Sequence, residues 1–394
     1  MKKQHLYEVD LMRACIILGV ICVHVLSSYD AKTVPFSTAN IGMDLLTMTF
    51  HFTREAFMFI TGLVLFYTYA DREFSSTSFW KKRFALIAIP YIAWTALYIL
   101  FTGTYLQGFD WTATHLWSTF VQSLLTANQF FLYFLMVSMQ LYLVFPLMLK
   151  LLKRLKRVHP WVFAGSFVLE LLIMGFNQWV MPHVDLTQLP TWLAVLLHYR
   201  DRFILTYQFW FVAGAIFAMN YQTVRDFVTS RGRMVASVLI VGLLALYGTY
   251  FAERFGLHFA DGAAVDVLQP IMIPYSLIAA ATLWTIGTAW SRVRTEERMR
   301  RFSGIVRFFG GVSFGIFLLH PIALHYVESI ANQLNVSRGV HFAFIPVIIA
   351  VTYVAAGFAA YAIGKIPMVS YIVGEKTRLA RPAKRELRNA RQAS

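Results

Sequence analysis

The sequence contains little charge and almost no cysteine. Only 14% of its 394 residues are charged, and its two cysteines, Cys15 and Cys22, both lie in the first apolar segment. Seven residues apart on one helix, the two thiols are too distant to form a disulfide with each other. We therefore expect both to be small packing residues, as buried free cysteines usually are.

Motifs that mark several large enzyme classes are also missing. There is no P-loop, no G-x-G-x-x-G after a strand, no G-x-S-x-G elbow and no Cys/His spacing typical of zinc sites. These absences argue against a phosphate-binding loop, a serine elbow and a structural zinc site. We predict no metal and no permanently bound cofactor.

Hydrophobic residues dominate what is present. They make up 58% of the chain, and the mean hydropathy is +0.57. This composition predicts an all-α polytopic membrane protein. We expect residues 1–374 to form one transmembrane domain and residues 375–394 a basic cytoplasmic tail. Runs long enough to cross a bilayer predict a bundle of about ten transmembrane helices, at residues 9–29, 44–69, 83–103, 130–150, 160–181, 203–220, 234–252, 268–290, 307–328 and 342–364.

Positive charge is distributed unevenly between the two sides of this predicted bundle. The formal net charge is +15, and 28 of the 35 Lys and Arg residues fall on the side of the termini, against five on the opposite side. The positive-inside rule then places both termini of a multi-pass cell-membrane protein in the cytoplasm. The basic balance is a topology signal, and we predict no nucleic-acid partner. On the opposite side, residues 104–129 look like an amphipathic segment at the membrane interface.

The predicted span 9–29 carries three ionisable residues, Asp10, Arg13 and His24. Arg13 and His24 are eleven residues apart, which puts both on one helix face, about 16 Å apart along the axis. Asp10 lies one turn before Arg13 and can pair with it. Ionisable groups cost about 2.5–3.5 kcal/mol each inside a membrane and usually face a bundle interior or a cavity. The stripe therefore indicates a path or a reaction site.

The predicted span 44–69 carries a second polar group. His51 and Glu55 are four residues apart on one face, and Arg54 precedes Glu55. We place Arg54 and Glu55 at about the depth of His24, so that His24, His51, Arg54 and Glu55 form one cluster. The alternative is a buried ion pair, Arg54 with Glu55 or Asp44, that only locks two helices together.

Further polar residues in the spans leave alternatives open. His320 is either part of a site or a buried histidine bonded to a backbone carbonyl, and Gln140 and Tyr142 are either contacts between helices or substrate contacts. Lys82 and Arg83 open the predicted span 83–103. They either follow the positive-inside rule or hold the phosphates of a nucleotide-like donor.

These residues favour general-base chemistry at an imidazole. Histidine has an unperturbed pKa of about 6.5, which suits proton transfer near neutral pH. The acceptor would be a hydroxyl held within hydrogen-bond reach. The donor would be activated beforehand, because no metal motif or nucleophilic Ser or Cys motif is visible.

Five short sequence motifs follow one another along the chain in an order that can be compared with known families. They are Asp10-Leu11-Met12-Arg13 with His24, an Arg-x10-His pattern; Arg54 followed by Phe57–Leu65; Lys82-Arg83 followed by Ile89-Pro90-Tyr91; Phe130–Pro146; and Ser313–His320. In these segments, and over about residues 6–365, the chain resembles the acyltransferase 3 family of bacterial integral-membrane acyltransferases. Two departures stand out. Ala56-Phe57 replaces a Val-Pro pair of many members, and Glu55 maps to no family motif.

The resemblance implies about ten core spans and an O-acyltransferase that uses cytoplasmic acyl-CoA as co-substrate, with acetyl-CoA as our first choice. The acceptor would be a hydroxyl of an extracytoplasmic carbohydrate or cell-envelope glycan. His24 would be the catalytic base, Arg13 its partner and Arg83 the donor-side cation, with Lys82 beside it. Glu55 is our own addition: we expect Glu55 or another polar neighbour to orient His24. The chain resembles the stand-alone type without a fused SGNH domain.

Two other functions fit the same residues. One is an exporter of a glycan or lipid-linked sugar, with the polar stripe along its path, but such transporters often show broken helices and paired halves. The other is a scaffold that uses the polar groups only for helix pairing. The number of ionisable groups at similar depth argues against the scaffold.

Overall fold

The computed structural model describes residues 5–375, and in this range the chain is all-α. It is 83% helical and contains no strand. The prediction of an all-α polytopic membrane protein is confirmed. Apart from Glu375, the predicted tail 375–394 lies outside the described residues.

Eight described helical segments are long and apolar enough to cross a membrane. They correspond to eight of the ten predicted spans, and several run beyond the predicted ends. Their helices are α1 (Tyr7–Asp30), α4 (Ser76–Tyr105), α6 (Tyr133–Arg154), α7 (His159–Gly175), α11 (Gly232–Phe251), α13 (Met272–Val293), α14 (Arg300–Asn332) and α16 (Ile345–Lys365).

The predicted span 44–69 is not one helix. It forms the end of α2 (Thr38–Phe50) and all of α3 (Phe52–Tyr69), with a break at His51. At this break the His51 N–H donates to the Met48 carbonyl at 3.2 Å, a tight i to i−3 bond in place of the α-helical one. The next helix, α3, runs without interruption through Ala56 and Phe57.

The predicted span 203–220 is also shorter than expected. It consists of a 3₁₀ turn, Ile204–Tyr207, and α9 (Gln208–Met219). Twelve α-helical residues cover about 18 Å, less than the hydrocarbon core of about 30 Å. Gln140 of α6 supports the preceding turns, because its amide donates to the Arg202 carbonyl (2.7 Å) and accepts from the Ile204 N–H (2.9 Å).

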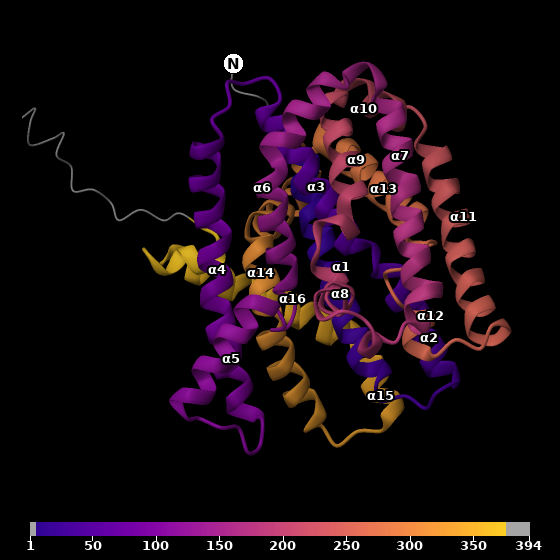
Figure 1. Ribbon diagram of the computed structural model, residues 1–394. Coiled ribbons are helices and arrows are strands. Elements are labelled where there is room, and N and C mark those ends of the chain that lie inside the picture. The colour runs from indigo at the N-terminus through magenta and orange to yellow at the C-terminus, as the bar shows by residue number, and fades with distance from the viewer. Residues whose placement is uncertain (1–4, 376–394) are drawn as a thin grey trace, which may run out of the picture.

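α1 is the central helix of the bundle. It contacts α2, α3, α13, α14 and α16, and Figure 1 shows it surrounded by other helices. Glycines permit close approach to two of these neighbours. A Cβ at Gly310 of α14 would lie 2.5 Å from the Asp10 carbonyl oxygen, and one at Gly287 of α13 would lie 2.9 Å from that of Glu8.

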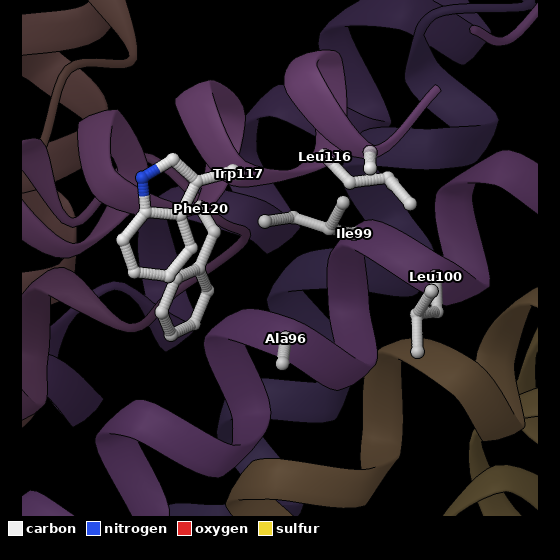
Figure 2. A pocket seen from close by; sticks show the side chains of 7 residues that line it. Ala96, Ile99, Leu100, Leu116, Trp117 and Phe120 are labelled. Carbon is white, nitrogen blue, oxygen red and sulfur yellow. The ribbon is translucent and has the colours of Figure 1, made fainter. Parts of the chain in front are cut away.

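The shorter helices lie around this core. The predicted amphipathic segment 104–129 contains α5 (Ala113–Thr126), which packs on α4 in the lower left of Figure 1. Figure 2 shows the apolar groove between α4 and α5, where Trp117 and Phe120 lie beside Ala96 and Ile99. The others are α8 (Thr191–His198), α10 (Tyr221–Thr229), α12 (Asp261–Ala264) and α15 (Arg338–Ala343).

Candidate active site

One cavity brings the five motif segments together. It has a volume of about 320 Å³. Each motif segment, from the first span to the Ser313–His320 segment, contributes at least one lining side chain, although these segments are spread over more than 300 positions of the sequence. The lining residues from these segments include Arg13, Phe57, Ile60, Arg83, Phe134, Ser138, Tyr142, Ser313 and Phe317.

Two guanidinium groups face this cavity. Arg13 lines it from α1 and Arg83 from α4. The Arg83 guanidinium lies among three aromatic rings, with its central carbon 5.7 Å from the Tyr142 ring centroid, 5.9 Å from Tyr69 and 6.0 Å from Phe79. Its Nε is buried without a hydrogen-bond partner. Aromatic faces stabilise a cation but leave its N–H groups free to bind an anion.

The structure shows no direct ion pair between Asp10 and Arg13, although the two charges still attract each other electrostatically. Asp10 instead bonds His5, with 2.6 Å between Oδ2 and Nε2. The two residues face different spaces, because Asp10 lines a cavity between α1 and the α13–α14 turn whereas Arg13 lines the one that holds Arg83. The two residues are one helical turn apart in the sequence, but their side chains project into different cavities.

Lys82 and Gln140 lie apart from this cavity. Lys82 is exposed and is not among the residues that line it. Both ends of the Gln140 amide are bonded to backbone groups of residues 202–204, so the contact between helices is the alternative that the structure supports. Tyr142, in contrast, lines the cavity beside Arg83.

His24 lies in a stack of three nearly parallel rings. Its centroid is 3.7 Å from that of Phe131 and 5.2 Å from that of His320, with interplanar angles of 20° and 16°. Phe131 and His320 complete the triangle at 5.4 Å. The two neighbouring rings orient the His24 ring, a role that we expect from the sequence for Glu55 or another polar neighbour.

His320 presents a free nitrogen inside the protein. The side chain is fully buried, and its Nδ1 lies 2.7 Å from the Phe317 carbonyl oxygen. Since a carbonyl only accepts, this nitrogen carries the proton and Nε2 is left with a lone pair. Nε2 is buried with no partner. His320 therefore bonds a backbone carbonyl and also keeps one atom available for chemistry.

The cavity and the histidine pair are adjacent. Phe317 lines the cavity, and its ring centroid is 6.1 Å from that of His320. Phe134, another lining residue, packs on Phe317 at 5.5 Å. A row of packed aromatic side chains thus connects the cavity that holds the two arginines with His320 and His24.

The predicted cluster of the second span is only partly assembled. His51 lies within electrostatic range of both His24 and Arg54. Arg54 pairs with Glu55 at 3.3 Å, and its guanidinium carbon lies 5.2 Å from the Tyr207 ring centroid. Among the described residues, no hydrogen bond joins Glu55 to His24, and the second oxygen of Glu55 is buried without a partner.

Sequence reasoning missed two residues of this interior. Phe131 stacks on His24, and nothing in an apolar run distinguishes it from other phenylalanines. Glu170 of α7 is fully buried and accepts from the Gln208 amide at 3.1 Å. A signal for Glu170 was present, because it is the single charged residue within the apolar run 160–181.

The arrangement combines a cationic cavity with paired imidazoles inside a helical bundle. Such a site can hold an anionic, activated donor at one end and accept a proton at the other. A family model described as an acyltransferase domain matches residues 6–362, nearly the whole chain. No curated protein and no solved structure matches the chain in the same comparisons. The chain is a membrane acyltransferase and belongs to the acyltransferase 3 family.

Proposed function

We propose that this acyltransferase moves an acyl group, with acetyl as the first choice, from acyl-CoA to a hydroxyl of an extracytoplasmic carbohydrate or cell-envelope glycan. The observation that carries the proposal is the convergence of the five motif segments on one cavity with two arginines. The choice of a carbohydrate acceptor rests on the family resemblance alone.

The charge of the cavity supports a CoA-type donor. Arg13 and Arg83 repel each other across the same space, and a phosphate group between them would turn that repulsion into attraction. Arg83 has an unpartnered N–H with which to bind it. The Lys and Arg excess on the side of the termini supports a cytoplasmic origin of the donor in a cell-membrane protein with both termini in the cytoplasm.

The imidazole pair supports the transfer step. His24 takes the proton of the acceptor hydroxyl, and the alkoxide oxygen forms a bond to the thioester carbonyl carbon. The carbon–sulfur bond then breaks, and the CoA thiolate takes up the proton from His24. The unpartnered Nε2 of His320, whose ring lies 5.2 Å from that of His24, is a second hydrogen-bond acceptor beside this reaction and is available to another hydroxyl of the acceptor sugar.

Thiol release from acetyl-CoA by the purified protein in nanodiscs tests the proposal, with and without added cell-envelope oligosaccharides. We expect His24→Ala to abolish transfer while the thermal transition is retained. The matched control is His183→Ala, since His183 is exposed and away from the cavity. Succinyl-CoA in place of acetyl-CoA tests the choice of acyl group.

Two results would overturn parts of this assignment. Equal turnover by wild type and His24→Ala would retain the enzyme but remove His24 from the mechanism. Absence of turnover, together with absence of stabilisation by acetyl-CoA, would favour the exporter of a glycan or lipid-linked sugar.

A further inference from the structure

Another cavity opens where α7 ends. It has a volume of about 470 Å³ and is formed by the end of α7, the π-helical turn Phe176–Val180, α8 and residues 200–206. In Figure 1, α8 lies at the centre of the view. We call this cavity the α7–α8 groove. It shares no lining residue with the cavity that holds Arg13 and Arg83.

Most of the α7–α8 groove is apolar and open to its surroundings. Leu172, Leu196 and Leu205 line it and are 67%, 40% and 57% exposed. Within a membrane, the molecules available to cover such a surface are lipids, and an alkyl chain matches its apolar lining. The groove between α4 and α5 in Figure 2 is similar in this respect, but no charged or amide side chain lines it.

The α7–α8 groove has a polar end that the α4–α5 groove lacks. Arg200 donates from Nε to the Asn177 side-chain oxygen at 2.7 Å and from Nη1 to the Leu197 carbonyl at 3.1 Å. These two bonds hold the guanidinium at the edge of the apolar lining. Asn177 is only 6% exposed, and its Nδ2 is buried without a partner although the residue lines the groove.

An unpartnered buried amide donor beside a fixed guanidinium requires an acceptor. Leaving such a donor unpaired inside a protein is unfavourable, because it has lost its bond to water. No Asp or Glu lines the groove, and the nearby Asp201 lies 3.7 Å from Arg202. Asn177 also lies in a π-helical turn, a distortion often found at functional sites. The acceptor that fits is an oxygen of an anionic group.

We propose that the α7–α8 groove binds one anionic phospholipid. One alkyl chain lies along Leu172, Leu196 and Leu205, and the phosphate accepts hydrogen bonds from Arg200 and Asn177. The proposal does not depend on acyl transfer. The groove nevertheless adjoins the turn that carries Tyr207, whose ring faces Arg54. An occupied groove would therefore support the wall of the bundle beside the second-span cluster.

Native mass spectrometry of the delipidated protein tests this, by titration with phosphatidylglycerol or with phosphatidylcholine of identical chains. We expect wild type to hold one phosphatidylglycerol at least tenfold more tightly than phosphatidylcholine. Arg200→Gln and Asn177→Ala should each reduce this preference to threefold or less. Arg298→Gln should retain it, because Arg298 is an exposed arginine outside the groove.

A groove-filling variant covers the case in which the polar variants fail to fold. Leu196→Trp should weaken phosphatidylglycerol binding at least tenfold, whereas Leu100→Trp in the α4–α5 groove should leave it unchanged. Equal affinity of wild type for the two lipids would overturn the proposal. So would an unchanged preference in Arg200→Gln, since general attraction to a basic surface would then account for binding.

Discussion

Two neighbouring basic residues at the start of α4, Lys82 and Arg83, have different environments. Lys82 and Arg83 are adjacent in the sequence, yet only Arg83 faces the cavity, among Tyr69, Phe79 and Tyr142. A planar guanidinium stacks well on such rings, and an ammonium does so less effectively. The sequence alone could place both residues at one membrane edge but could not choose between them.

Arg83→Gln is expected to raise the KM for acyl-CoA by tenfold or more in the thiol-release assay. A hydrogen bond to a charged group contributes about 1.5–3 kcal/mol, which corresponds to roughly tenfold to a hundredfold in affinity. Lys82→Gln is the matched control and should change KM by less than twofold, because its side chain is exposed. Equal effects of the two substitutions would show that general basic charge, rather than this cavity, attracts the donor.

Glu170 is expected to stabilise the packing of α7 on α9. Its Oε2 atom accepts from the Gln208 amide at 3.1 Å and lies 3.5 Å from the Phe209 backbone nitrogen. Glu170→Ala should lower the free energy of unfolding by about 1–3 kcal/mol, because buried donors lose their acceptor. Glu170→Gln, which keeps a carbonyl oxygen, should restore most of this. Thermal unfolding in detergent measures both, and equal losses would show that the negative charge itself is required.

At the scale of residues, sequence reasoning recovered the polar positions better than their partners. Arg13 and His24 were placed on one helix face, and the structure gives each of them a surrounding cavity or ring stack. Asp10 bonds His5 directly and not Arg13, and Phe131 was not predicted at all. Helix periodicity fixes the face on which a residue lies, but the partner across that face belongs to another helix.

At the scale of elements, α3 and α9 pack with their backbones close together. A Cβ at Gly62 of α3 would lie 2.5 Å from the Phe211 carbonyl oxygen, and one at Gly214 of α9 would collide with the Phe59 carbonyl oxygen. The obstacle is backbone in both cases, so no side-chain movement relieves it. Small residues at such crossings let membrane helices approach and gain packing energy that the lipid does not supply.

Gly214→Ala is therefore expected to destabilise the protein by at least about 1–3 kcal/mol, the usual cost of overpacking. Gly62→Ala should act in the same direction. Gly248→Ala in α11 is the control, since a Cβ there meets nothing within 4 Å, and alanine should stabilise the helix slightly. Thermal unfolding of the three variants decides this, and a Gly214→Ala protein as stable as wild type would refute the close crossing.

The break at His51 explains why the second span was predicted incorrectly. The sequence around it contains no proline or glycine that would end a helix there. The carbonyl of Thr49 accepts instead from the Tyr275 hydroxyl of α13 at 2.7 Å, and the Thr49 hydroxyl lies 2.7 Å from that of Tyr247. Partners from distant helices thus replace the local bonds, and no local pattern can reveal that.

At the scale of the whole molecule, hydropathy predicted the class and most of the spans, and the family match confirms the resemblance inferred from five loose motifs. The arrangement of the helices was beyond reach of the sequence. Nothing in the order of the spans indicates that α1 lies at the centre, or that Glu8 near its start bonds the Tyr221 hydroxyl of α10.

The orientation of the whole molecule is the last prediction. In a background with Cys15 and Cys22 replaced by alanine, we introduce Ser230→Cys beside α10 or Thr187→Cys before α8, both at exposed positions. The positive-inside rule predicts that a membrane-impermeant maleimide labels Thr187→Cys in intact cells, and Ser230→Cys only after permeabilisation.

The opposite labelling pattern would contradict more than the topology. Arg13 and Arg83 lie near the starts of α1 and α4, and the cavity that they line also includes Glu375 at the end of the described chain. A cytoplasmic N-terminus places these two arginines where acyl-CoA is available. Were Ser230→Cys labelled from outside, the two arginines would face away from the cytoplasm, and the acyl donor would have to be sought among extracytoplasmic anions.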